Sequence, residues 1–327
     1  MFLKTFVAFF IGFILCIVFV PICKYLARRF QVLDIPDPTR KIHSNPTPYL
    51  GGLAILVGIL GVFLVDPALV IAKYLLGACL LWVVGTLDDK KNLNLWFRVV
   101  AELIAGVVAV ALIPLYKFWH NPIEAIVIVA VIVVVVNSAN LLDNIDGSLA
   151  TVSLAVFVSL AINFYLLREL SLLLLCAVAV GSLGGFLIFN WPEAKIFMGD
   201  GGSLTIGYLL IVIVLSQAPR GGILKSLGSE IFFLTTFIID TSVVVISRHL
   251  SHKSILTGGK DHITHRLLKK GLPNSITILT LGLFSFISGL IGVALQRNYL
   301  PSYFGYFWVA IWLVGVWLFV TQFSEID

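Results

Sequence analysis

Long apolar runs separated by short polar segments dominate the chain. The segment 126–136, for example, contains only Ile, Val and Ala. A helix crosses the hydrocarbon core of a bilayer with about 20 residues, at about 1.5 Å of rise per residue. Runs of about that length, bounded by charge, Pro or Gly, predict eleven transmembrane helices at 5–25, 49–65, 68–87, 98–116, 123–142, 149–167, 171–189, 203–218, 230–247, 274–296 and 302–321.

Composition supports a membrane protein. The 327 residues are 59% hydrophobic and 12% charged, with a mean hydropathy of +1.05, which is too apolar for one soluble core. Lys4 precedes an apolar run without a small-residue cleavage site, so the first run is an uncleaved span rather than a signal peptide. The four cysteines lie in predicted spans and are expected to be buried thiols. We expect an all-α integral membrane protein forming a single polytopic domain over 1–327.

Positive charge predicts the orientation. With eleven spans, fifteen of the 22 Lys and Arg residues fall on one side. Positive residues favour the cytoplasmic side, which places the N-terminus outside and the C-terminus in the cytoplasm. Anchoring against anionic lipid accounts for the net charge of +5, so no nucleic acid partner is implied.

A polar stretch, 137–147, interrupts this pattern after the fifth run. In a helix that continues through it, Asn137, Asn140 and Asn144 fall at i, i+3 and i+7 on one face, with Asp143 and Asp146 beside them. Such oxygens suit a hard cation such as Mg²⁺. The alternative is a helix end that caps itself among lipid headgroups, but acids near a membrane core are costly to keep without a task.

Two earlier inside segments also carry candidate chemistry. Lys41 and His43, beside Arg40, are suited to a phosphate at the membrane surface, although topology alone could explain the positive charge. Asp88 and Asp89 are adjacent at the end of a span, where like charges raise each other's pKa unless a cation compensates. Pairing with neighbouring lysines is the structural alternative.

Two later segments follow. Asp200 lies among flexible glycines just before a predicted span, which suits a metal ligand or phosphate site, or a turn with Asp as the N-cap. His262, His265 and Arg266 lie in the longest polar segment. Two histidines three residues apart could bind zinc, but no Cys or third His lies nearby, so phosphate or nucleotide recognition fits better.

All of these clusters fall on the predicted cytoplasmic side. A transporter would place polar residues near the midplane and show two related halves. The pattern instead indicates an enzyme with an active-site cleft on the cytoplasmic face, where a polar substrate meets a lipid. A carrier for an anionic solute remains the alternative outside enzymology.

The motifs resemble those of the polyprenyl-phosphate N-acetylhexosamine-1-phosphate transferase family, glycosyltransferase family 4, over nearly the whole chain. Five ordered blocks carry the resemblance, namely 40–52, Asp88-Asp89, 137–147, 190–203 and 262–267. The resemblance implies Mg²⁺-dependent transfer of N-acetylglucosamine 1-phosphate, or a related sugar phosphate, from a UDP-N-acetylhexosamine to undecaprenyl phosphate, with release of UMP. Mn²⁺ would be a substitute cofactor.

The resemblance also implies roles for individual residues. It makes Asp200 and Asn140 metal ligands, and Asp88, Asp89, Asp143 and Asp146 catalytic. The substrate-binding residues would be Lys41 and His43 at the lipid phosphate, Asn190 and Phe197 near uracil, and His262, His265 and Arg266 at the sugar diphosphate. Many members read His-x-His-His where this chain has Thr264, which puts one contact in doubt.

The first loop resembles the N-acetylglucosamine branch, which begins O-antigen, enterobacterial common antigen or teichoic acid synthesis. The adjacent histidines typical of the muramoyl-pentapeptide branch are absent, although that donor remains an alternative. The family implies a multi-pass protein of the bacterial cytoplasmic (inner) membrane, with membrane lipid around it and homodimer formation as one option.

Overall fold

The apolar runs form helices in the computed structural model of the protein, which describes residues 1–34, 46–67, 69–112, 122–217, 228–254 and 259–322. Twelve α-helices lie in this part of the chain. They are α1 (Phe2–Arg29), α2 (Gly51–Leu60), α3 (Leu69–Lys91), α4 (Leu95–Leu112), α5 (Pro122–Leu142), α6 (Ser148–Leu167), α7 (Leu170–Asn190), α8 (Gly199–Ser216), α10 (Thr235–Leu250), α11 (Ile263–Lys269), α12 (Asn274–Gln296) and α13 (Tyr303–Gln322).

Ten of the eleven predicted spans are helices long and apolar enough to cross a membrane. The ninth is continuous from η3 (Ile231–Leu234), a 3-10 turn, into α10. The predicted span 49–65 is shorter, because α2 has ten residues and is followed only by the four-residue 3-10 helix η1 (Gly61–Leu64). Together they reach about 23 Å, less than the roughly 30 Å of a hydrocarbon core.

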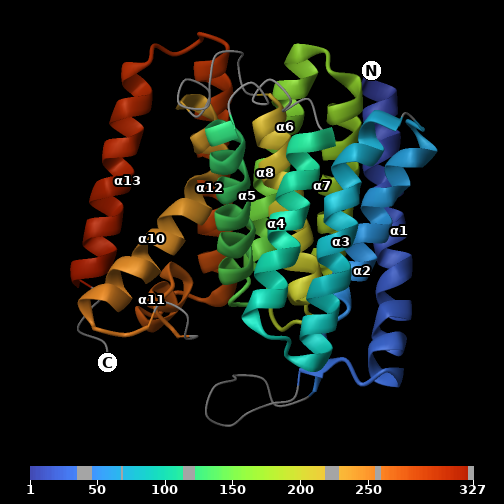
Figure 1. The fold of residues 1–327 in the computed structure, drawn as a ribbon. Coiled ribbons are helices and arrows are strands. Elements are labelled where there is room, and N and C mark those ends of the chain that lie inside the picture. The colour runs from blue at the N-terminus through green and yellow to red at the C-terminus, as the bar shows by residue number, and fades with distance from the viewer. Residues whose placement is uncertain (35–45, 68, 113–121, 218–227, 255–258, 323–327) are drawn as a thin grey trace.

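The helices run roughly side by side, and the start of α1 and the end of α13 lie at opposite ends of the bundle (Figure 1). The ends of α3, α5 and α7 and the starts of α4, α6 and α8 all lie at the end drawn lowest. This arrangement agrees with an odd number of passes. Which end faces the cytoplasm stays a prediction from the Lys and Arg pattern.

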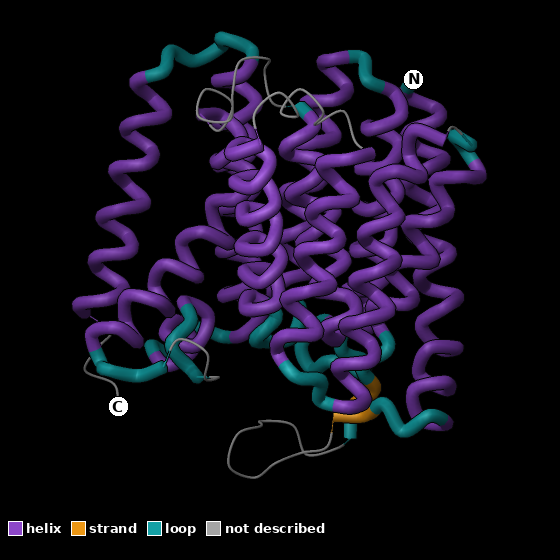
Figure 2. The backbone as a smooth tube through the Cα atoms, viewed as in Figure 1, coloured by secondary structure: helices purple, strands orange, loops and turns teal. Residues whose placement is uncertain are grey.

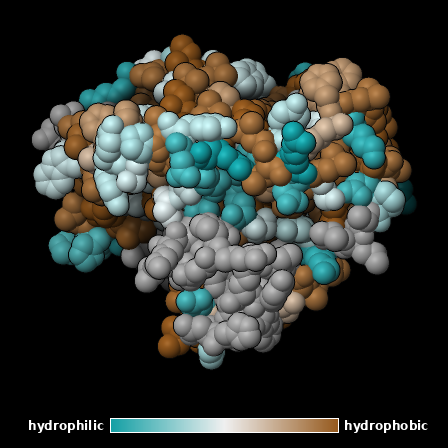
Figure 3. Space-filling view, turned by 90° about the horizontal axis from the view of Figure 1, so that it is seen from above, coloured by the Kyte–Doolittle hydropathy of each residue, from teal (hydrophilic) through white to brown (hydrophobic). Residues whose placement is uncertain are grey.

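The central helix is α8, which is almost entirely buried, whereas α13 stands at the edge and is mostly exposed. Exposed aromatic and aliphatic side chains on α1 and α13 fit a lipid-facing surface. In the end view of Figure 3, hydrophilic residues gather toward the middle, and hydrophobic residues occupy much of the rim. The protein is therefore a multi-pass helical membrane protein.

A short antiparallel ribbon closes the base of the first loop at the lower end of the bundle (Figure 2). Its strands are β1 (Leu33–Asp34) and β2 (Thr47–Pro48). The segment after β2 pairs with the segment before α8, since Phe197 N donates to Pro48 O and Gly52 N to Met198 O. The predicted residues Lys41 and His43 lie outside the described residues.

Two sequence-based boundaries were wrong. The glycine-rich segment before residue 203 is the first turn of α8, which begins at Gly199, and not a turn that precedes it. α5 ends at Leu142, so Asn137 and Asn140 share this helix but Asn144 lies beyond it. The chain reverses between α5 and α6 at Gly147, which has φ +75° and begins the next helix as its cap.

Gly85 lets α3 approach the start of α8. A Cβ on Gly85 would lie 2.5 Å from the Asp200 carbonyl carbon and 2.6 Å from the Asp200 carbonyl oxygen. Gly85→Ala must therefore push two backbones apart, and we expect it to lower the free energy of unfolding by about 1–3 kcal/mol. Thermal unfolding in detergent measures this.

The matched control is Gly315→Ala on α13, where an added Cβ meets nothing within 4 Å. Because alanine favours helix by about 0.5–1 kcal/mol over glycine, this control should be neutral or slightly stabilising. Equal stability of the two variants would argue against close packing at Gly85.

Candidate active site

Asp89 joins the end of α3 to the start of α8. Its carboxylate accepts hydrogen bonds from the backbone N–H groups of Asp200, at 3.0 Å, and Gly201, at 3.4 Å. These are free donors in the first turn of a helix, where negative charge is also favoured by the helix dipole. Asp89 therefore fixes the position of Asp200, and its predicted catalytic role stays a prediction.

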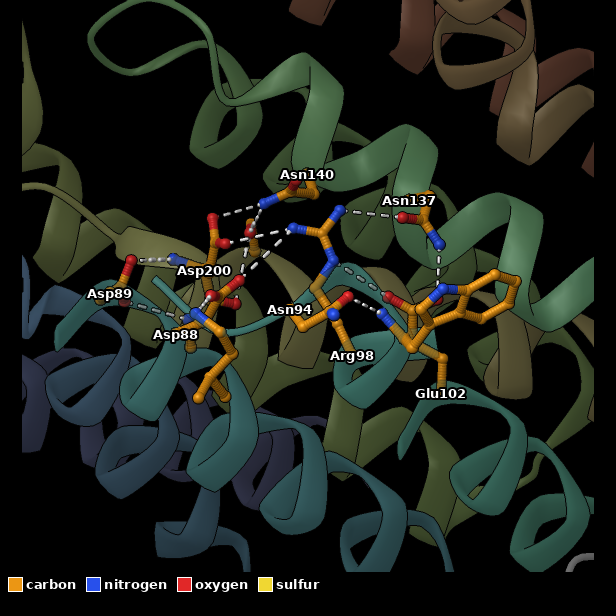
Figure 4. Close-up of polar contacts among 12 residues, drawn as sticks. Asp88, Asp89, Asn94, Arg98, Glu102, Asn137, Asn140 and Asp200 are labelled. Atoms are coloured by element: carbon orange, nitrogen blue, oxygen red, sulfur yellow. Dashed lines mark hydrogen bonds and ion pairs between the residues drawn. The ribbon is translucent and has the colours of Figure 1, made fainter. Parts of the chain in front are cut away.

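Asp200 and Asp88 form the acidic centre of the site (Figure 4). The two carboxyl groups lie against each other. Asn140 Nδ2 donates to Asp200 Oδ1 at 2.7 Å and also to Ser203 Oγ at 2.9 Å. Leu93 N donates to Asp88 Oδ1 at 2.6 Å. Residues from α3, α5 and α8 thus meet at one end of the bundle.

Arg98, near the start of α4, is the cation among these acids. Its Nη1 lies 3.3 Å from Asp200 Oδ2 and 3.7 Å from Asp88 Oδ2. On the other side it reaches Asn137 Oδ1 through Nη2, at 3.1 Å, and lies 3.5 Å from Glu102 Oε1 through Nε. The guanidinium group therefore bridges two polar groups of residues (Figure 4).

Sequence reasoning missed Arg98, Glu102 and the contacts of Asn137. Arg98 was counted only as a positive charge that sets orientation. The available signal was its i, i+4 spacing from Glu102 in a segment that is otherwise apolar. Ionisable residues inside a predicted span are by themselves candidates for a functional site.

The donor chemistry of this centre fits magnesium. Mg²⁺ is usually held by one or two carboxylates together with water and substrate phosphates, and it prefers hard oxygen ligands. Within the described residues, no group of three or more His, Cys, Asp or Glu side chains is placed to hold a metal. Asp200 and Asp88 are therefore the carboxylates that could hold Mg²⁺ with phosphates. With Asn140 Nδ2 turned to Asp200, its Oδ1 is the atom left for a cation.

Asp143 lies in the loop between α5 and α6, close to Asp200. Burial, followed by the negative charges of Asp200 and Asp146, raises the pKa of Asp143 to about 7. Near neutral pH this carboxyl group is therefore poised between its two protonation states. A bound cation beside it would favour the ionised form.

The same loop is braced against the loop between α7 and α8. Asp146 Oδ2 accepts a hydrogen bond from Ala194 N at 2.9 Å. Asn190 Oδ1 accepts from Gly147 N at 3.0 Å, and its Nδ2 donates to Ile196 O at 2.9 Å. These contacts give Asp146 and Asn190 structural roles. Their predicted contacts with a nucleotide stay predictions.

The ring of Phe197 is half-buried next to Tyr49, with ring centroids 6.0 Å apart. Both residues lie where the segment after β2 pairs with the segment before α8. A partly open pair of aromatic rings can stack with a flat heterocycle. The predicted stacking by Phe197 stays a prediction, and Tyr49 is a neighbour that sequence reasoning did not identify.

The buried Asp240 of α10 anchors the start of α11. Its Oδ2 lies 2.8 Å from His262 Nδ1, and its Oδ1 accepts from Ile263 N at 2.9 Å. His262 is consequently buried, while His265 is partly exposed. Burial, with nearby positive charge, lowers the pKa of His265 to about 4, so it is neutral near pH 7.

Arg266 is bound by the protein on several sides. Its Nε donates to Asp261 O at 2.8 Å, its Nη1 to Phe319 O at 2.7 Å and its Nη2 to the Ser247 hydroxyl. These bonds tie α11 to α10 and α13. The predicted contact of Arg266 with a diphosphate stays a prediction that would require some of these bonds to change.

Thr264 connects α11 to the polar loop. Its hydroxyl donates to Asn144 Oδ1 at 2.6 Å, and the side chain is fully buried. Thr264→Val keeps the shape but leaves the amide oxygen unpaired, so we expect a loss of about 1–3 kcal/mol in unfolding free energy. Thr264→Ser, which keeps the hydroxyl, is the control. Equal thermal stability of the Val and Ser variants would show that this hydrogen bond contributes nothing.

The structure therefore gathers most of the predicted residues at one end of the bundle. The bundle of long apolar helices and this acidic cluster define a membrane-embedded protein with a polar site. The model of the family described as Glycosyl transferase family 4 matches residues 71–218, which contain Asp88, Asn140, Asp143 and Asp200. The chain belongs to glycosyl transferase family 4.

Named relatives match over most of the chain. It is 28% identical to a probable undecaprenyl-phosphate N-acetylglucosaminyl 1-phosphate transferase of Bacillus subtilis, over 98% of this chain and 91% of that protein. It is 24% identical to the undecaprenyl-phosphate alpha-N-acetylglucosaminyl 1-phosphate transferase of Yersinia pestis, over 89% and 84%. A decaprenyl-phosphate N-acetylglucosaminephosphotransferase of Mycobacterium tuberculosis is 27% identical, over 80% and 75%.

Proposed function

We propose that this protein transfers N-acetylglucosamine 1-phosphate from UDP-N-acetylglucosamine to undecaprenyl phosphate and releases UMP. It would act in the bacterial inner membrane, at its cytoplasmic face, as the first membrane step of a cell-envelope polysaccharide. The observation that carries the proposal is the meeting of Asp88, Asn140, Asp143 and Asp200 at one end of the bundle. The printed names of the relatives supply the donor and acceptor class.

The reaction joins two phosphates. An oxygen of the carrier phosphate attacks the β-phosphorus of the UDP-sugar, and the bond from that phosphorus to the oxygen of UMP breaks. A phosphate monoester has a second pKa near about 6, so the nucleophile is already largely dianionic at neutral pH and a strong base is not needed. Positioning and charge neutralisation are therefore the main tasks of the site.

The residues divide these tasks. Asp200 and Asp88, with Asn140, would hold Mg²⁺, which supplies positive charge at the diphosphate. Arg98 is the protein's own cation at the same place, within 3.3 Å of Asp200. Asp143, with its pKa raised to about 7, is suited to accept the proton of the minor monoanionic carrier phosphate.

The test uses the purified full chain in detergent or liposomes with undecaprenyl phosphate, Mg²⁺ and a panel of radiolabelled UDP-sugars. UDP-N-acetylglucosamine should give UMP and a labelled lipid, and omission of undecaprenyl phosphate should abolish both. A labelled lipid formed only from the UDP-muramoyl pentapeptide would assign the protein to that branch instead. Solute flux across sealed vesicles without any new lipid would indicate a transporter.

A further inference from the structure

Glu102 is a fully buried carboxylate that lies one helical turn after Arg98 on α4. Its Oε1 lies 3.5 Å from Arg98 Nε, and its Oε2 accepts a hydrogen bond from Asn137 Nδ2 at 2.5 Å. Burying an ionised carboxylate without a compensating cation is costly. Arg98 is the cation that lies nearest to it within the contacts described above.

Asn137 connects the same two residues from α5. Its Nδ2 donates to Glu102 Oε2 and to Val133 O, while its Oδ1 accepts from Arg98 Nη2. Turning the amide over would place donor against donor at Arg98 and acceptor against acceptor at Glu102. The orientation of this side chain is therefore set by its partners, and it holds the guanidinium group at a defined place.

Arg98 is shared between two sets of acids. Asp200 and Asp88 lie on one side, and Glu102 with Asn137 lies on the other (Figure 4). One positive charge divided among three carboxylates cannot neutralise Asp200 completely. Removing the charge of Glu102 would let the guanidinium pair more closely with Asp200 and Asp88, which would then attract another cation less strongly.

We propose that Glu102 and Asn137 are positioning residues that hold Arg98 beside Asp200, and that Glu102 shares the charge of Arg98 so that Asp200 stays available to a divalent cation. The proposal deepens the proposed function, on which it rests for the identity of the substrates. It assigns no contact between substrate and either Glu102 or Asn137.

A purely structural role is the alternative, because the same contacts join α4 to α5. Cation binding separates the two possibilities. We would measure the affinity of the purified full chain for Mn²⁺ by electron paramagnetic resonance, without nucleotide or lipid. Glu102→Gln should raise the Kd for Mn²⁺ about tenfold, which corresponds to about 1.4 kcal/mol. Asn137→Ala should change it in the same direction.

Glu230→Gln is the matched control, because Glu230 is also fully buried and pairs with Gln296 at 2.8 Å, in contacts separate from this site. It should leave the Kd for Mn²⁺ unchanged even if it lowers stability. If Glu102→Gln unfolds as Glu230→Gln does, yet its folded fraction binds Mn²⁺ like the unmodified protein, the role of Glu102 is structural and the proposal is overturned.

A double-mutant cycle tests whether Glu102 acts through Arg98. In an Arg98→Met background, Glu102→Gln should change the Kd for Mn²⁺ by less than about twofold. An undiminished tenfold effect there would mean that Glu102 acts independently of Arg98, and the proposal would be wrong. Both measurements omit the substrates, so failure of the proposed reaction would not be confused with failure of this inference.

Discussion

Replacing Asp200 with asparagine is expected to lower the rate of UMP release by about 10²- to 10³-fold, the scale seen when one preorganised electrostatic contact to a transition state is removed. Asp200 is the carboxylate on which Arg98, Asn140 and Asp88 converge. Asparagine has a similar shape but no negative charge, so it would pair poorly with both Arg98 and Mg²⁺. Steady-state rates over a range of Mg²⁺ concentrations measure the loss.

The matched control for this variant is Asp66→Asn. Asp66 follows η1, is partly buried and accepts a hydrogen bond from Ser171 Oγ at 2.7 Å, away from the acidic cluster. It should leave the rate of UMP release nearly unchanged. An Asp200→Asn protein that is correctly folded and fully active would remove Asp200 from the metal site.

Arg98→Met is expected to lower both stability and activity. It leaves Glu102 buried without its cation, and breaking a buried ion pair by removing one partner costs about 3–5 kcal/mol. It also removes positive charge beside Asp200, where the diphosphate would lie. We therefore expect kcat to fall by about 10²-fold or more in the protein that remains folded. Thermal unfolding and steady-state kinetics measure the two effects separately.

Arg98→Lys distinguishes charge from geometry. Lysine keeps the positive charge, but one ammonium group cannot reproduce the contacts that Arg98 makes through three nitrogen atoms. It should recover most of the stability and only part of the activity. Arg297→Met provides the comparison, since Arg297 bonds to the neutral Asn163 at 2.9 Å and should cost less. Wild-type kinetics in Arg98→Met would contradict the role given to this residue.

The fold was predictable because helix length and apolarity are local properties of a membrane span. Ten predicted spans are present as long helices, and only the second is shorter than expected. The end of α5 was less predictable, since Asn and Asp are compatible both with a helix and with the turn that follows it. Nothing in the local pattern distinguishes Asn140 inside the helix from Asn144 outside it.

The site was only partly predictable. Conspicuous acids such as Asp88 and Asp200 stood out against apolar surroundings. Arg98 was hidden among other basic residues, and its partner Asn137 is 39 residues away. Arg266 shows the opposite case, because it was read as a substrate contact from its motif, while its hydrogen bonds in the structure go to α10, α13 and Asp261.

The amino-acid order alone determined that this chain is a multi-pass helical protein and which polar motifs it carries, because apolar runs in lipid must satisfy their backbone hydrogen bonds within helices. Only the tertiary structure decided that Asp89 caps α8, that Arg98 lies between Asp200 and Glu102, and that Thr264 bonds to Asn144. These contacts join residues far apart in sequence or depend on side-chain direction, and both are set by how the helices pack.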